Sequence, residues 1–133
     1  MSGSNFSILL PLKDRANYTF RFLQYLDWTK FPYKIIIADG GKDKGVENFL
    51  SNKDNLPSLS YEYIRYPYDE TLVDFYNKMT DAVSYINSAT VSVMDNDDFI
   101  ILEGIVKCLQ DLKENPQASS SRGAIHSISI SND

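Results

Sequence analysis

The sequence is poor in the residues that most often reveal a function by themselves. One of its 133 residues is a cysteine, Cys108, and one is a histidine, His126. A single cysteine excludes an internal disulfide framework, and a lone histidine gives no support for a Ser-His-Asp or Cys-His catalytic arrangement. Cys108 belongs to a helically spaced apolar set with Ile105, Leu109 and Leu112, so we expect it to pack in the core.

Membrane and export signals are also missing. No apolar run approaches the roughly 20 residues of a membrane-spanning helix. The first four residues are uncharged, and the apolar stretch after them is too short for a signal peptide. The sequence therefore predicts a cytoplasmic protein without a transmembrane segment.

The chain has no excess of positive charge. It holds 13 Lys and Arg against 18 Asp and Glu, a formal net charge of −5. Because a nucleic-acid binder needs a basic surface, we expect no nucleic-acid partner. The acidic balance is compatible with a nucleotide held through a divalent cation, since clustered carboxylates bind such ions. Gly-x-x-x-x-Gly-Lys-Ser/Thr and Gly-x-Gly-x-x-Gly are absent, which argues against those two nucleotide-binding folds.

Segments of strand character alternate with segments of helical periodicity. Strands are expected over residues 7–10, 33–38, 59–63, 90–94 and 124–130. The first helix is expected to be capped by Asp14 or Asn17, and the third near Asp69 or Thr71. The apolar positions that mark the third helix are Leu72, Phe75, Tyr76, Met79, Val83 and Ile86. The alternation predicts one domain over residues 1–133, a three-layer α/β/α fold with a mostly parallel sheet.

The strongest motif is Asp95-Asn96-Asp97-Asp98, directly after the fourth predicted strand. Three carboxylates within four residues repel one another unless solvent or a cation screens them. A hard divalent cation such as Mg²⁺ or Mn²⁺ would relieve this repulsion and leave positions for phosphate oxygens. The alternative is a solvated acidic turn in which Asp98 caps the next helix. Ligands of parallel α/β sheets bind at the carboxyl ends of the strands, and this position favours a metal site.

Asp39-Gly40-Gly41 forms a sharp exit from the second predicted strand. The glycines allow a ligand to approach the backbone closely, and Asp39 could accept a hydrogen bond from a base or a ribose hydroxyl. A turn aspartate that caps the following helix is equally compatible with this spacing.

Four of these segments, in this order, resemble family-2 glycosyltransferases of the GT-A type. The first is the strand and Pro-containing loop from Ser7 to Arg15. The second, Ala38-Asp39-Gly40-Gly41, is similar to an Asp-Asp-Gly-Ser turn, with Ala38 in place of the first Asp. The third is the helix that carries Asn77. The fourth, Val93 to Phe99, contains the Asp-x-Asp motif.

The resemblance implies the nucleotide-sugar-binding half of a metal-dependent transferase. The residues implied in binding the nucleotide sugar are Pro11, Lys13, Asp14, Asp39, Gly40, Asn77 and Asp97. Those implied in holding Mn²⁺ or Mg²⁺ are Asp95, Asp97 and Asp98. The donor expected is a UDP-sugar or similar compound, and an acceptor hydroxyl would attack the anomeric carbon with inversion. In the family the catalytic base follows the Asp-x-Asp half, and about 30 residues beyond Asp98 leave little room for it, so no base is assigned.

Two other functions stay open. The chain could be a non-catalytic module that binds a nucleotide sugar or a cation. It could also be a receiver-type signalling domain, but a carboxylate pair after the first strand and a lysine after the fifth are missing. Pairing of a sheet edge through Ile125, Ile128 and Ile130 would also allow a homodimer.

Overall fold

The computed structural model describes residues 5–129 and 131. It divides the chain into two compact units, Met1–Phe99 and Ile100–Asp133. The first unit holds the sheet, and the second holds the helix α4 (Leu102–Glu114). In the described part of the chain, no helix is both long enough and apolar enough to cross a membrane.

The first unit is a four-stranded, all-parallel sheet with helices on both faces. Its strands are β1 (Phe6–Leu12), β2 (Lys34–Asp39), β3 (Tyr61–Arg65) and β4 (Thr90–Val93), in the spatial order β3-β2-β1-β4. Its helices are α1 (Ala16–Trp28), α2 (Gly45–Ser51), the short 3₁₀ helix η1 (Lys53–Asn55) and α3 (Leu72–Val83). This confirms the expected α/β fold with a parallel sheet.

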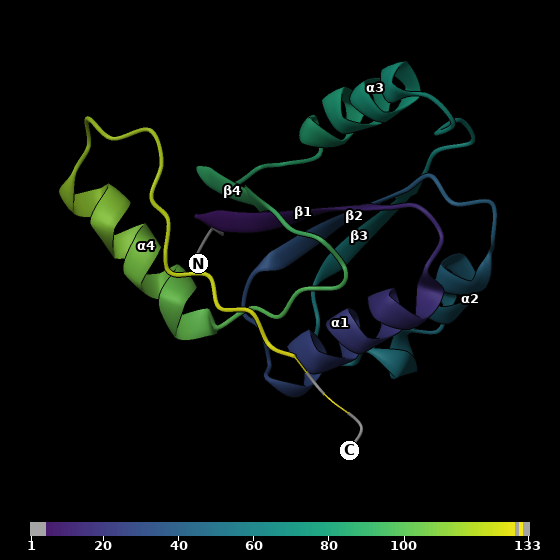
Figure 1. The fold of residues 1–133 in the computed structure, drawn as a ribbon, viewed down its shortest axis with the longest axis horizontal. Coiled ribbons are helices and arrows are strands. Elements are labelled where there is room, and N and C mark those ends of the chain that lie inside the picture. Colours follow the sequence, from purple (N-terminus) through teal and green to yellow (C-terminus); the bar gives the residue numbers. More distant parts are fainter. Residues whose placement is uncertain (1–4, 130, 132–133) are drawn as a thin grey trace. The chain divides into compact units, whose positions relative to one another are not determined.

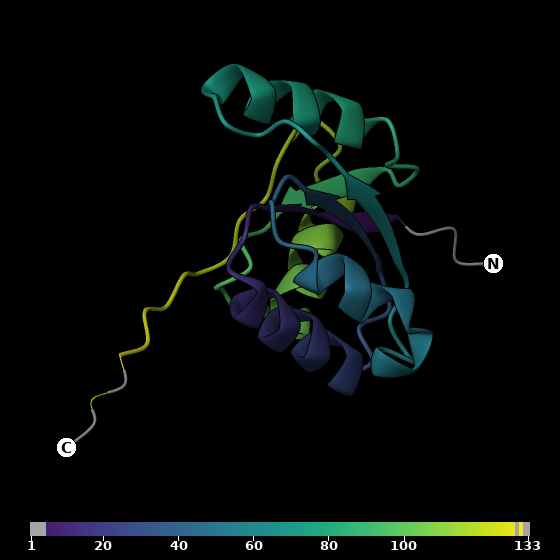
Figure 2. The same cartoon turned by 90° about the vertical axis from the view of Figure 1, so that its right-hand side faces the viewer.

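The direction of each crossover decides which face a helix covers. From β1 to β2 to β3 the chain moves one way across the sheet, and from β3 to β4 it returns past β1. Because parallel crossovers are right-handed, the returning helix has to cover the opposite face. Figures 1 and 2 show this arrangement: α1 and α2 lie on one face of the sheet, and α3 lies on the other.

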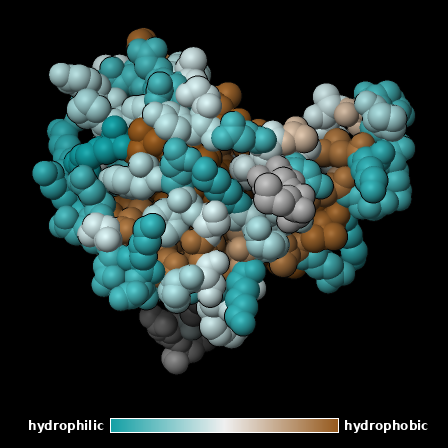
Figure 3. All heavy atoms as spheres, turned by 180° about the vertical axis from the view of Figure 1, so that it is seen from behind, coloured by the Kyte–Doolittle hydropathy of each residue, from teal (hydrophilic) through white to brown (hydrophobic). Residues whose placement is uncertain are grey.

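The two central strands form the core. Ile8, Leu9 and Leu10 of β1 are at most 2% exposed, and Ile35 to Ile37 of β2 are fully buried. Both faces of these strands are covered, which explains why they read as continuous apolar runs rather than alternating ones. On the face shown in Figure 3, hydrophilic side chains occupy most of the surface, and hydrophobic ones appear in patches between them.

β1 continues through Pro11, where the sequence predicted that the strand would stop. Pro11 and Leu12 pair with Ala38 and Asp39 of β2, whereas the pairing of β1 with β4 ends at Leu9. Beyond Leu9 one side of β1 is therefore an edge, and the missing N–H of Pro11 disrupts no ladder there.

Three other expectations were wrong in detail. Residues 124–129 form no strand, and Ile130 lies outside the described residues. Ile125 and Ile128 are about four-fifths exposed, at 81% and 80%, so the sheet edge expected to pair two copies is not formed in the described part; a homodimer stays a prediction.

The other two errors concern helices. The cap of α1 is Arg15 rather than Asp14 or Asn17, whereas the expected cap of α3 at Thr71 is confirmed, with a capping box completed by Asp74. In α3 the buried positions are Lys78 and Ala82, and the expected core residues Leu72, Tyr76 and Val83 are more than half exposed.

Candidate functional site

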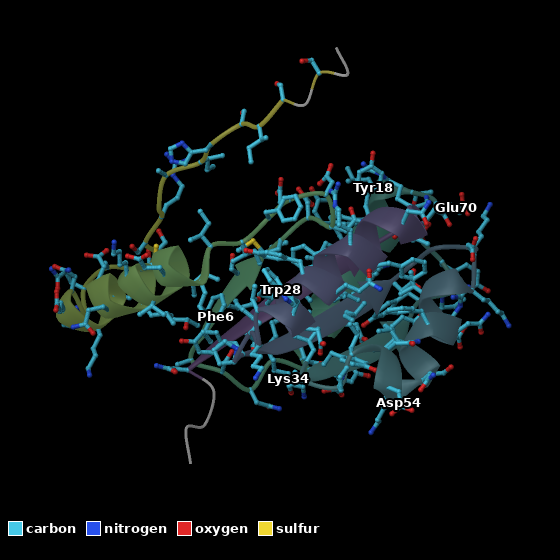
Figure 4. The ribbon with its side chains drawn as sticks, turned by 90° about the horizontal axis from the view of Figure 1, so that it is seen from below. Phe6, Tyr18, Trp28, Lys34, Asp54 and Glu70 are labelled. Atoms are coloured by element: carbon cyan, nitrogen blue, oxygen red, sulfur yellow. The ribbon has the colours of Figure 1, made fainter. Side chains whose placement is uncertain are left out.

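The strand order places a topological switch point between the carboxyl ends of β1 and β4. The chain leaves β1 toward β2, but β4 lies on the other side of β1, so the connections diverge at this point. In open α/β sheets, ligands bind at such a switch point. Figure 4 marks this end of the sheet with Tyr18 and Glu70, and the amino ends of β1 and β2 with Phe6 and Lys34.

The three carboxylates after β4 converge. Asp95, Asp97 and Asp98 are exposed, and each offers an oxygen within 4.8 Å of the oxygens of the other two. The loop that carries them is anchored where Met94 N donates to Leu9 O at 3.1 Å. The helix α4 begins at Leu102 with Ile101 at its cap position, so Asp98 does not cap it as the alternative interpretation required.

Asn96 lies within this acidic loop but is turned inward. It is 8% exposed, and its Nδ2 donates to Thr19 Oγ1 of α1 at 3.1 Å. Asp95 and Asp97, on either side of the buried Asn96, are exposed. The loop is therefore fixed by a polar contact that is not itself part of the cluster.

Two arginines border the cluster: Arg15, the cap residue of α1, and Arg21 within α1. Arg15 Nη2 lies 3.4 Å from Asp97 Oδ2, and Arg21 Nη2 donates to the backbone oxygen of Asp97 at 3.3 Å. Both guanidinium groups lie over the ring of Tyr18, at 4.4 Å and 5.0 Å from its centroid. Positive charge thus offsets part of the repulsion among the carboxylates.

Asp39 is buried at the carboxyl end of β2 and holds the turn that follows it. Its Oδ1 accepts from Gly41 N at 2.9 Å, and its Oδ2 accepts from Tyr63 Oη at 2.6 Å. Arg65 Nη1 lies 3.9 Å from Oδ2. Burial, and next the hydrogen bond to Asp39, raise the pKa of Tyr63, so this phenol stays protonated and donating. Asp39 closes its own turn and does not cap α2, whose cap residue Lys44 makes no side-chain cap.

Gly40 is needed because another side chain occupies the space where its Cβ would be. A Cβ built at this position would overlap the carboxylate of Asp69. Asp69, 6% exposed, forms an ion pair with Lys78, 2% exposed, and Lys78 Nζ also donates to Leu12 O at 3.0 Å. This buried pair joins α3 to the end of β1.

Of the other predicted residues, Lys13 and Asp14 lie in the loop after β1 and each contacts a neighbouring loop, whereas Pro11 lies within β1. Pro11 is half-buried in the strand itself, and Lys13 Nζ donates to the backbone oxygen of Asp69. Asp14 Oδ1 accepts from Lys42 N at 3.0 Å. The ends of β1, β2 and β3 are therefore linked directly through side chains.

Asn77 is not brought to these residues. It is exposed on α3 and lines a pocket of about 350 Å³ together with Tyr66, Pro67, Tyr68, Asp74, Lys78 and Asp81. None of the other predicted site residues lines this pocket. Its tyrosine Tyr66 donates to Asp81 Oδ2 at 2.6 Å.

The sequence interpretation missed several residues through their partners. The Asp39 partners Tyr63 and Arg65 and the Asp97 partner Arg15 are distant in the chain, whereas Asp69 and Lys78 are nine positions apart. One local signal was present: Lys78 falls between Phe75 and Ala82 on the inner stripe of α3, where a charged residue needs a buried partner.

Comparisons with known proteins agree on the fold. No protein-family profile matches the sequence, and no curated protein sequence matches it. Two crystal structures of S. aureus TarS, a glycosyltransferase, are similar in structure. One covers 84% of this chain with a TM-score of 0.58 and 18% identity. The other, of TarS residues 1–349, covers 91% with a TM-score of 0.60 and 17% identity.

The chain therefore has a glycosyltransferase-like fold. It spans 20% of the first TarS chain and 38% of the second. At these identities the likeness establishes the fold alone, and the activity has to be argued from the side chains.

Proposed function

We propose that this chain binds a nucleoside-diphosphate sugar through a divalent cation and is the donor-binding part of an inverting glycosyltransferase. The observation that carries the proposal is the convergence of the Asp95, Asp97 and Asp98 carboxylates at the carboxyl end of β4. They lie at the switch point of a glycosyltransferase-like fold, which is where such sheets bind ligands.

The donor set fits a hard cation. All three side chains offer oxygen, as Mg²⁺ and Mn²⁺ prefer, and their exposure leaves coordination positions for phosphate oxygens. When bound, such an ion supplies Lewis-acid stabilisation of the negative charge on the departing diphosphate. Asp95, Asp97 and Asp98 would hold it.

The neighbouring loops would hold the nucleoside, as the resemblance implies. Asp39 is 2% exposed, so it would act on the nucleoside indirectly, by holding the turn at Gly40 and Gly41 through its hydrogen bonds from Gly41 N and Tyr63 Oη. Lys13 and Asp14 lie exposed on the adjoining loop, and Gly40 lets the chain turn tightly above Asp69. Asn77 lines the separate pocket on α3 and is given no role in this nucleoside site.

Calorimetric titration of UDP with Mn²⁺ tests the binding step. We expect binding that disappears with a chelator and weakens by about tenfold or more in Asp97→Ala and Asp98→Ala, since each variant removes a charged ligand. Asp54→Asn is the matched control: it removes a carboxylate from η1, which Figure 4 places well away from Tyr18. Equal metal-dependent affinity in all these proteins would show that the cluster is not the metal site.

The chemical step needs a separate assay. Incubation with UDP-sugars and Mn²⁺ would release UDP if the chain catalyses transfer to an acceptor or to water. Metal-dependent binding without any release would favour a non-catalytic donor-binding module. Binding of GDP, CDP or ADP in place of UDP would change the donor base and leave the metal site as proposed.

A further inference from the structure

Arg15 and Asp97 form an ion pair at the edge of the three-carboxylate cluster, with a distance of 3.4 Å between Nη2 and Oδ2. We propose that Arg15 is a counter-charge that occupies the position of the cation on Asp97, and that it turns to the diphosphate when metal and nucleotide bind. The inference rests on the proposed function and adds a residue that the sequence motifs did not single out for the donor site.

The backbone directs Arg15 toward the cluster at a conformational cost. Asp14 and Arg15 are consecutive non-glycine residues with positive φ, 57° and 56°. Left-handed backbone is unfavourable for residues with a Cβ, and it persists where surrounding contacts impose it. Here the contact is the hydrogen bond from Lys42 N to Asp14 Oδ1 at 3.0 Å. The strained turn leads into α1 and places the side chain of its cap residue, Arg15, beside Asp97.

The pair is too weak to resist a divalent ion. The side chains of Arg15 and Asp97 are 53% and 41% exposed, and solvent-screened ion pairs contribute little free energy. A cation bound by three carboxylates would displace one guanidinium. The displaced group stays close, because its Cζ lies 4.4 Å from the centroid of the Tyr18 ring.

Phosphate is the ligand that suits the displaced group. A guanidinium makes paired, charge-assisted hydrogen bonds to phosphate oxygens, and the proposed cation would bring a diphosphate to the same edge of the cluster. Arg15 thus weakens binding of the metal ion alone and strengthens binding of the metal ion together with the nucleotide diphosphate. This predicts that a diphosphate increases the affinity for Mn²⁺ and that the effect depends on Arg15.

Arg21 is a matched control on the same helix. It also lies over Tyr18, at 5.0 Å, but its Nη2 donates to the backbone oxygen of Asp97 rather than to the carboxylate. Removal of its charge therefore changes the local potential without freeing a metal ligand.

Electron paramagnetic resonance of free and bound Mn²⁺ tests the inference on the full chain. Without nucleotide, we expect Arg15→Met to bind Mn²⁺ about two- to fivefold more tightly than wild type, as loss of a competing exposed ion pair allows. Arg21→Met should show a smaller gain. With Mn²⁺ present, inorganic pyrophosphate and UDP should bind Arg15→Met about tenfold more weakly, because a charge-assisted hydrogen bond is lost.

The two effects have opposite signs, which a general loss of structure cannot produce. Unchanged or weaker Mn²⁺ binding in Arg15→Met would overturn the inference, and so would an Arg21→Met protein that behaves in the same way. The proposed function itself fails if the wild-type protein binds no Mn²⁺. It also fails if the Asp97→Ala variant binds Mn²⁺ as tightly as the wild type does. Pyrophosphate carries no base, so its result does not depend on which nucleotide the donor contains.

Discussion

Lys78 and Asp69 form a buried ion pair directly beneath the turn at Gly40. Lys78 reaches across from α3, is 2% exposed, and also donates to the carbonyl oxygen of Leu12 at the end of β1. Asp69 lies in the loop after β3, and its backbone oxygen accepts from Lys13. The pair therefore joins three of the segments that border the candidate site.

Loss of one partner of this pair should be strongly destabilising. We expect Lys78→Met to lower the free energy of unfolding by about 3–5 kcal/mol, because it leaves the Asp69 carboxylate buried and unpaired. Urea denaturation measures the change. The double variant Lys78→Met/Asp69→Leu should recover part of the loss. If its destabilisation is the sum of the two single changes, the residues are not coupled. Lys107→Met, in the exposed pair of Lys107 with Glu103, should leave stability unchanged.

Gly40→Ala should destabilise the protein by about 1–3 kcal/mol through overlap with the Asp69 carboxylate, which Lys78 holds in place. The cause is steric, since no described glycine has a positive φ. Gly104→Ala is the contrasting change: its Cβ would meet nothing within 4 Å, and alanine favours helix α4. Thermal unfolding compares them, and similar losses in both variants would contradict the steric argument.

Thr19→Val should weaken Mn²⁺ binding although Thr19 is not a proposed ligand. The change keeps the shape of the side chain but removes the hydroxyl that accepts from Asn96 Nδ2. We expect a loss of about 1–2 kcal/mol in stability from the unpaired amide and a several-fold lower metal affinity from the loosened loop. In Thr80→Val the lost hydroxyl bonds only within α3, to Tyr76 O. The Thr80→Val variant should bind Mn²⁺ as tightly as the wild type. An equal loss of Mn²⁺ affinity in both variants would argue against anchoring of the acidic loop by the hydrogen bond from Asn96 to Thr19.

The stability of the protein should fall as the pH rises above about 10, the ordinary pKa of tyrosine. Tyr63 has a raised pKa in the folded state, from burial first and the hydrogen bond to Asp39 second. Its stabilising contribution is therefore complete below the unfolded pKa and is lost as the pH rises toward the folded one. Tyr63→Phe should show a shallower decline between pH 9 and 11 in urea unfolding. Tyr61 and Tyr66 also have raised pKa values, so the free energy of unfolding of the variant should still decline with pH to some extent. If Tyr63→Phe left this pH dependence unchanged, a role for Tyr63 would be excluded.

The local sequence pattern was sufficient to predict the structure of segments that depend mainly on their own residues. The apolar run Ile35-Ile36-Ile37 predicts a strand covered on both faces, and its neighbours in sequence decide where it ends. The capping box at Thr71 and Asp74 is likewise local, because its two partners lie three residues apart in the sequence. Pattern failed at residues 124–129, where apolar residues alone do not make a strand without a neighbouring edge to pair with.

The sequence by itself determined the alternating α/β order and the position of Asp95, Asp97 and Asp98 immediately after a strand. Both follow from short-range periodicity and from the composition of one loop. Tertiary structure decided which side chains meet that loop and support it. Arg15 is 82 positions from Asp97, and Lys78 is 66 positions from Leu12. No local period encodes such pairings; they arise because parallel strands bring their carboxyl ends, and the loops that follow them, to one edge of the sheet.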